Sequence, residues 1–183
     1  LNTMDKGIAD AHSQLASKVN KGINVYVKDY ENLKDGDDWF PAISEALSEA
    51  KTSKGNVILP EGNVPIYSTI NIPSHVGFYG QGITATRLEY YGSGNAITVG
   101  LRTSTIDNMN VFVNMGDFTL SNMSETSVNG ISINSLRSTF DKVYVEGFSD
   151  GAGFLLTTAA DHGSHYNNFY SCQSHRNKYN IEF

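Results

Sequence analysis

The chain has 183 residues, a formal net charge of −6, 17 glycines and only 4 prolines, which is enough length for one ordinary domain with its own core. Its thirteen lysines and arginines are scattered, and this pattern argues against nucleic acid as a partner. The single cysteine, Cys172, excludes an internal disulfide and a cysteine-based metal site, and no apolar run approaches the roughly 20 residues of a membrane span. We expect no cofactor and no metal.

The first segment, residues 1–22, has the pattern of an amphipathic helix. Its apolar residues recur at spacings of three and four, which places them on one face: Leu1, Met4, Ile8, Ala11 and Leu15. One interpretation is a neck that forms a trimeric coiled coil, and the other is an ordinary helix packed on its own domain. We favour the neck, because the segment precedes the domain and no partner helix lies beside it in the sequence.

The next segment predicts a strand, a helix and a second strand. Val25 and Val27 alternate as in a strand, and Asp37 or Asp38 can cap a helix over residues 39–51. The buried stripe of this helix is predicted to contain Trp39, Ile43, Leu47 and Ala50. Gly55 is expected to end the helix, and "NVILPEG" then reads as a buried strand followed by a turn.

From Tyr67 onward no further helix is predicted, and a loose repeat appears. The segments 104–113, 138–148 and 167–175 align with Ile106, Phe140 and Phe169 in one column and Met109, Val143 and Cys172 in another. A second strand accompanies each unit, in the stretches "NAITV", "NGISIN", "GAGFLL" and "YNIEF". Recurrence after about 30 residues indicates a solenoid of stacked units, and it favours this fold over a β-sandwich of similar short strands. The polar segment 114–129 is predicted to protrude as a groove wall.

The stretch "VKDYENLKDGDDWFPAISEALSEA", followed by "GNVILPEG" and "YSTINIPSHVGFYGQG", resembles the opening of the pectate-lyase-like right-handed parallel β-helix proteins, notably phage tailspikes and capsule depolymerases. The resemblance covers roughly residues 25–183. It implies an all-β solenoid, with residues 1–22 as a neck and 23–183 as the N-terminal coils of a parallel β-helix whose end is capped by the predicted helix. Two departures from the family pattern, Glu31-Asn32 and Gly36-Asp37-Asp38, affect a cap and a loop.

The resemblance also bears on the apolar end of the sequence. Ile181 and Phe183 lie in an alternating strand, and the terminal units of a solenoid need a cover. We therefore expect a further coil to follow, and we expect the sequence to be the front portion of a longer protein.

Candidate catalytic residues are carboxylates near turns of neighbouring repeats, namely Glu146, Asp150 and Asp161. Glycoside hydrolysis needs two carboxyl groups about 5 to 10 Å apart, and adjacent strands lie about 4.8 Å apart, so a pair is geometrically feasible. Solvated turn charges are the competing interpretation. Candidate substrate-binding residues are Tyr166, His175 and Arg176, and Lys142 is a further residue suited to proton abstraction.

Two clusters could suggest a metal, and we interpret neither as a metal site. Asp161, His162 and His165 lie close together but span a turn. Asp35, Asp37 and Asp38 lack the spacing of a complete calcium loop, and helix capping explains them better. Tyrosines of the strand-rich half could stack on sugars, although strands favour aromatic residues in any case: Tyr79, Tyr90, Tyr91, Tyr166, Tyr170 and Tyr179.

The resemblance implies a tail spike or tail fibre of a virion, a homotrimer that contacts other tail or baseplate proteins and recognises a host-surface polysaccharide. In the full-length form it would depolymerise that polysaccharide with residues of later coils, and the present segment would be inactive. The alternatives are a secreted pectate-lyase-like lyase or hydrolase and a non-catalytic structural adaptor, because this fold carries many functions.

Overall fold

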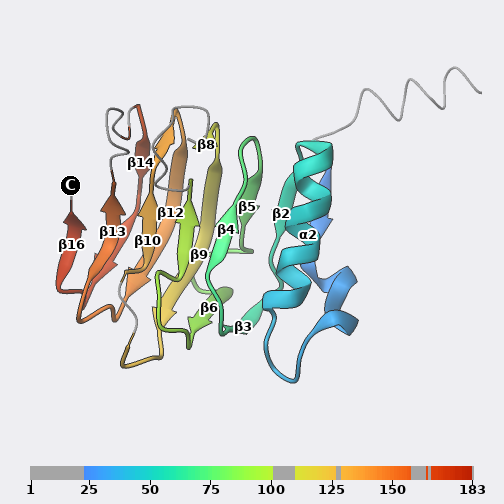
Figure 1. Ribbon diagram of the computed structural model, residues 1–183, viewed down its shortest axis with the longest axis horizontal. Coiled ribbons are helices and arrows are strands. Elements are labelled where there is room, and N and C mark those ends of the chain that lie inside the picture. The colour runs from blue at the N-terminus through green and yellow to red at the C-terminus, as the bar shows by residue number, and fades with distance from the viewer. Residues whose placement is uncertain (1–22, 101–109, 127–128, 158–163, 165, 183) are drawn as a thin grey trace, which may run out of the picture.

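The computed structural model describes residues 23–100, 110–126, 129–157, 164 and 166–182. The predicted neck, residues 1–22, lies outside them. The described chain is mostly β-sheet with parallel strands, and two helical segments precede most of the strands. The strands lie side by side from α2 at one end of the molecule to β16 at the other (Figure 1).

The helical segments pack at the end of the molecule that contains the first strands. The short strand β1 (Asn24–Tyr26) leads into a 3-10 helix, η1 (Val27–Leu33), and then α2 (Phe40–Ser53). The predicted strand is therefore shorter than expected, because Val27 already begins η1. Helix α2 packs against η1, β1, β2 and β4, and its predicted stripe is buried as expected.

Both ends of α2 use local interactions that the sequence partly predicted. The carboxylate of Asp38 accepts the N–H of Phe40 at 2.8 Å and satisfies one of the free donors at the start of the helix. At the other end the left-handed residue is Lys54, at φ 52°, and not Gly55. Gly55 is needed for a different reason, since a Cβ there would lie 2.3 Å from the carbonyl oxygen of Ile23.

The strands after α2 form five successive tiers, where a tier is a set of strands that follow one another in the chain and pair with the equivalent strands of the next set. The tiers contain β2 (Asn56–Ile58), β3 (Gly62–Ile66) and β4 (Ile70–Ile72); β5 (Gly77–Tyr79), β6 (Thr86–Tyr90) and β7 (Ile97–Val99); β8 (Asn110–Val111), β9 (Asn114–Asn122) and β10 (Ile131–Ile133); β11 (Ser135–Leu136), β12 (Thr139–Glu146) and β13 (Ala152–Leu156); and β14 (Asn168–Tyr170), β15 (Gln173–His175) and β16 (Tyr179–Glu182). Every ladder between named strands is parallel, and equivalent strands of neighbouring tiers pair with one another. This recurrence is compatible with a β-solenoid.

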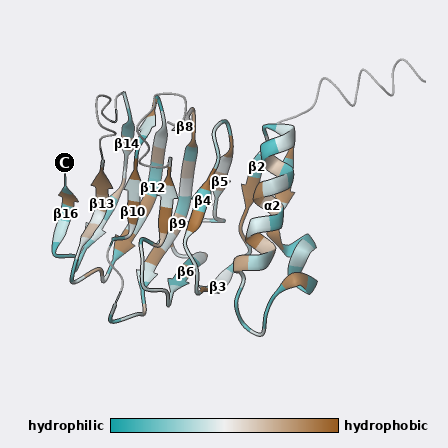
Figure 2. Cartoon of the chain, viewed as in Figure 1, coloured by the Kyte–Doolittle hydropathy of each residue, from teal (hydrophilic) through white to brown (hydrophobic). Residues whose placement is uncertain are grey.

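The core lies between the sheets, where equivalent residues of successive tiers stack. One column runs through Val25, Val57, Phe78, Met115, Phe140 and Phe169. The rings of Phe140 and Phe169 stack with centroids 4.8 Å apart, which confirms the predicted alignment of these two residues. The four second strands were also predicted correctly, because they pair as β7, β10, β13 and β16. Apolar and polar residues form alternating bands along the strands (Figure 2).

One predicted alignment is wrong. The partner of Phe140 in the preceding tier is Met115, and not Ile106, which lies outside the described residues. Residues 114–122 accordingly form β9, a strand inside the sheet, and this part of segment 114–129 does not protrude as a wall. The alignment failed because the tiers have unequal lengths, so the chain does not return to the same column after a constant number of residues.

The corners between strands use residues in the left-handed region that are not glycine. One column of such corners lies two residues before successive strands and contains Lys54, His75, Phe112, Arg137 and Tyr166. A second contains Asp117, Lys142 and Ser171, and bends β9, β12 and the β14–β15 connection. This backbone conformation is uncommon for such side chains. Stacking supports it, because the rings of His75 and Phe112 are 5.5 Å apart and the guanidinium of Arg137 lies 6.0 Å from the Phe112 ring.

Candidate functional site

A cleft of about 500 Å³ lies on the outer face of the sheet, over strands β3, β6, β9, β12 and β15. Five of its lining residues occupy equivalent positions on these neighbouring strands: Asn63, Arg87, Thr119, Tyr144 and Gln173. They face outward because side chains alternate along a strand, and the intervening residues Leu88, Leu120 and Val145 are buried. The register therefore converts five dispersed residues into one continuous row.

The side of the cleft is formed by the loop of residues 80–85, which lies beside β9. The hydroxyl of Thr119 donates to the carbonyl of Ile83 at 2.7 Å, and the N–H of Gly82 donates to the carbonyl of Asp117 at 2.8 Å. Gly80 allows this close approach, because a Cβ there would lie 2.2 Å from the carbonyl oxygen of Asp117. The loop thus holds the apolar side chain of Ile83, which is 41% exposed, on the lining of the cleft.

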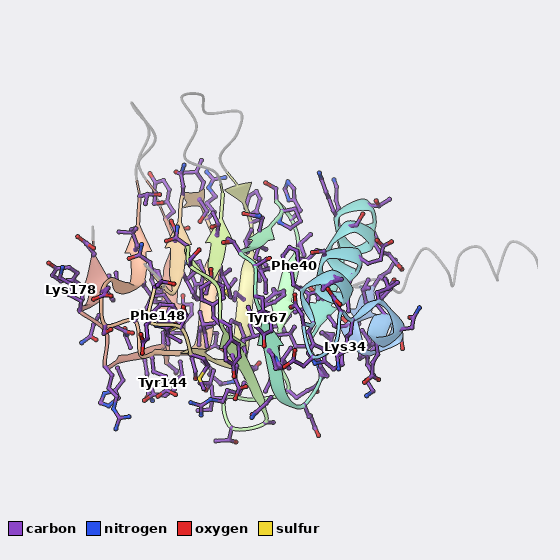
Figure 3. All side chains as sticks on the ribbon, turned by 60° about the horizontal axis from the view of Figure 1, so that its bottom comes forward. Lys34, Phe40, Tyr67, Tyr144, Phe148 and Lys178 are labelled. Atoms are coloured by element: carbon purple, nitrogen blue, oxygen red, sulfur yellow. The ribbon has the colours of Figure 1, made fainter. Side chains whose placement is uncertain are left out.

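Tyr144 supplies an aromatic surface to the same cleft. It follows the buried Val143 in β12 and points away from the strands (Figure 3), whereas Phe148 just beyond the strand is buried. The Tyr144 side chain is partly exposed, and a phenol ring offers an apolar face and a polar tip. Together with Ile83, it gives the cleft two large apolar contact surfaces beside its amide, hydroxyl and charged groups.

The charged groups of the cleft are paired with each other. Glu146 of β12 binds the guanidinium of Arg87 on β6, and the hydroxyl of Ser121 donates to the same carboxylate oxygen at 2.9 Å. The Glu146 side chain is 18% exposed and that of Arg87 is 46% exposed, so the pair lies at the surface of the cleft. Of the described residues that line the cleft, only Arg87 carries a positive charge and only Glu146 a carboxylate.

The structure describes two of the three predicted catalytic residues, Glu146 and Asp150. Glu146 lines the cleft, whereas Asp150 lies exposed in the turn between β12 and β13, and Asp161 lies outside the described residues. Lys142, the further candidate, is at a bend and pairs with Asp117 and Asp141, each at 3.7 Å.

The predicted substrate-binding residues are divided between two places. His175 is exposed and is the register partner of Glu146 on the neighbouring strand. Arg176 follows it in the left-handed conformation. Tyr166 is 77% exposed and belongs to the corner column before β14, away from the cleft row.

The tyrosines considered for sugar stacking have different environments. Tyr90 is buried, and its hydroxyl accepts the N–H of Gly94 at 3.0 Å, so it belongs to the core. Tyr67 and Tyr91 stack on each other with centroids 5.0 Å apart, and loss of hydration followed by nearby carboxylates raises the pKa of both. Burial likewise raises the pKa of Tyr79.

Two further sequence predictions can be examined at the level of individual contacts. Asp37 and Asp38 bind Tyr67 and the start of α2, which agrees with capping, and the described residues contain no group of three or more potential metal ligands. The predicted cluster of Asp161, His162 and His165 lies outside them. Cys172 is half-buried, and burial raises the pKa of its thiol and keeps it protonated.

Most of the residues that line the cleft were not predicted from the sequence. Asn63, Ile83, Arg87, Thr119, Tyr144 and Gln173 were not candidates. The available signal was the polar residue between two buried ones in each strand, but such positions occur on every exposed strand face. Only the register shows which of them share a row.

The fold and this cleft define a mostly β protein of parallel, tiered strands with a polar and aromatic cleft on one outer face. No protein family model matches the chain, and no curated protein matches it. Among solved structures, the chain is similar to ORF18 of Geobacillus virus E2, with a TM-score of 0.62 and 18% sequence identity over 92% of this chain. The chain spans 40% of the length of that protein. At this identity the likeness shows the fold alone. Among the described residues, no helix is long and apolar enough to cross a membrane.

Proposed function

We propose that this chain is part of a phage tail spike or tail fibre that binds a host-surface glycan in the cleft beside Tyr144. The observation that carries the proposal is the row of outward side chains on five parallel strands, with Tyr144 and Ile83 among amide and hydroxyl groups. Sugar rings combine apolar faces with hydroxyl groups, and such a cleft can contact both. The fold shared with a viral protein supports the viral assignment.

The proposed architecture is a right-handed parallel β-helix, with α2 covering its first tier and residues 1–22 forming a trimeric neck. The parallel ladders and the position of α2 support this proposal. A homotrimer would act in the virion tail, at the host cell surface, and would contact other tail or baseplate proteins through the neck. The solution mass of the chain, measured with and without residues 1–20, tests this assembly. A mass of three chains that falls to one after removal of the segment supports the neck, and a single chain in both forms contradicts it.

We propose recognition, and not cleavage, as the activity of this cleft. Hydrolysis of a glycoside requires two carboxyl groups at the scissile bond. Glu146 is the one carboxylate among the described lining residues, and it is already bound by Arg87 and Ser121. Depolymerisation by a longer form of the protein would therefore use other residues.

The experiment that tests glycan recognition is a binding measurement on an array of immobilised glycans that includes neutral, amino, uronate and phosphate sugars. The wild-type chain is compared with Tyr144→Ala and with the control Tyr170→Ala, which removes an exposed tyrosine of the neighbouring strand segment outside the cleft. We expect Tyr144→Ala to weaken binding by about tenfold, because the aromatic contact is lost. Retention of signal by Tyr170→Ala locates the effect in the cleft. Absence of binding to every glycan contradicts the proposed function.

A further inference from the structure

The charge arrangement of the cleft restricts the kind of sugar that it can take. Arg87 is the one cation among the described lining residues, and its guanidinium is bound to Glu146. Glu146 is held on a second side by the hydroxyl of Ser121. Each charge of the cleft is therefore satisfied before a ligand arrives.

A second carboxylate makes the surroundings of this pair more negative. Glu89 on β6 pairs in register with Ser121 on β9, and Ser121 pairs with Glu146 on β12, so both carboxylates belong to one row of the sheet. Two strand spacings separate the backbones of Glu89 and Glu146, about 10 Å. This separation is within about one Debye length at ordinary salt concentration, so each carboxylate repels an anion brought to the other.

From this arrangement we infer that the cleft binds uncharged sugar residues and excludes sugars that carry carboxylate or phosphate groups; the inference rests on the proposed glycan-binding function. An acidic sugar would compete with Glu146 for the guanidinium of Arg87, and binding in its place would exchange Glu146 for the anionic group of the sugar. That exchange gains one ion pair, breaks another, and leaves the carboxylate of Glu146 without its cation beside the new anion.

The remaining lining groups suit hydroxyl and acetamido substituents. Asn63 and Gln173 each carry an amide that both donates and accepts hydrogen bonds. Tyr144 and Ile83 contribute apolar surface for a ring face or a methyl group. These groups recognise an uncharged sugar without requiring either member of the ion pair to change partner.

The test is a change of ligand charge preference in Glu146→Gln. Glutamine keeps the size of the side chain but removes its charge, which leaves the Arg87 guanidinium free to bind an anion. The probes are hexagalacturonate and its methyl ester, which differ in charge, together with the glycan array used for the wild type. We expect Glu146→Gln to gain affinity for acidic glycans by about tenfold or more, because a charge-assisted hydrogen bond becomes available. This gain should fall with added salt.

Glu89→Gln is the matched control, because it removes the same unit charge from the same row, two strands away, and leaves the Arg87–Glu146 pair in place. Because it removes only the longer-range repulsion, it should raise the affinity for acidic glycans less than Glu146→Gln does. An equal gain in both variants would attribute the effect to overall charge and overturn the inference. Binding of acidic glycans by the wild-type protein would also overturn it, while leaving the proposed glycan-binding function intact. Absence of binding by the wild type to every glycan would overturn the proposed function, and the inference with it.

Discussion

Glu146 on β12 binds Arg87 on β6 although 59 positions separate them in the chain and strand β9 lies between their strands. The contact exists because successive tiers place their outward residues in rows, and a long arginine side chain can reach past one strand to the next. The row that contains Arg87 and the row that contains Glu146 are adjacent on the same face. The pair therefore links two tiers across the tier that lies between them, at the surface of the cleft.

This ion pair should contribute little to folding, because both partners retain contact with solvent. We expect Arg87→Met to lower the free energy of unfolding by about 1 kcal/mol or less, as is typical of exposed pairs. Urea denaturation monitored by circular dichroism measures the change. Lys142→Met, which removes another exposed surface cation, is the control and should have a similarly small effect. A loss of several kcal/mol in Arg87→Met would show that the pair is a structural element of the sheet.

Asn129 should contribute much more to the free energy of unfolding, because it is buried and its contacts connect three tiers. Its side-chain amide donates to the Asn95 side chain at 2.9 Å, and its side-chain oxygen accepts the N–H of Ala152 at 2.8 Å. We expect Asn129→Ala to cost about 2 kcal/mol, since it leaves a buried N–H without an acceptor. Asn71→Ala, at an exposed position of β4, should change the free energy of unfolding by about 0.5 kcal/mol or less. Equal effects of the two substitutions in urea denaturation would contradict this account.

Gly80→Ala should disturb the loop that lines the cleft. The added Cβ would meet the carbonyl of Asp117 at 2.2 Å, so the loop has to move away from β9. We expect a loss of about 1–3 kcal/mol in stability, as for other overpacked sites, together with weaker glycan binding as Ile83 shifts. Gly94→Ala is the control, since its nearest contact would be an ordinary 3.4 Å. Unchanged stability and binding in Gly80→Ala would mean that the loop adapts without cost.

Tyr30 should make stability depend on pH in the alkaline range. Its hydroxyl donates to Glu49 of α2, and this hydrogen bond, followed by partial burial and the nearby carboxylate charges, raises the pKa of Tyr30 from 10.0 to about 12. A raised pKa in the folded state means that the contribution is complete below pH 10 and disappears as the pH rises through about 12. The difference in unfolding free energy between wild type and Tyr30→Phe should therefore shrink over this interval. A difference that stays constant with pH would exclude the hydrogen bond as its source.

The sequence correctly predicted those helices and strands that a single local pattern of apolar residues identifies. The stripe of α2 is buried as its spacing indicated, and the second strands of the tiers were identified from short apolar runs beside glycine or asparagine. The segment around Ile106 was misaligned, because β9 begins at Asn114 and the corners before it are formed by residues such as Phe112 that do not normally mark a turn. A glycine at these corners would have revealed the tier boundaries.

The sequence by itself determined the predominance of short strands, the position of α2 and the stacking of Phe140 on Phe169, since each follows from the spacing of apolar residues along the chain. The tertiary structure decided which outward residues became neighbours. Alternation along a strand shows that Arg87, Tyr144 and Gln173 face away from the core, but only the register between tiers brings them into one row. That register depends on the length of each connection and on the left-handed corners, which are set by packing between tiers and have no local sequence signature.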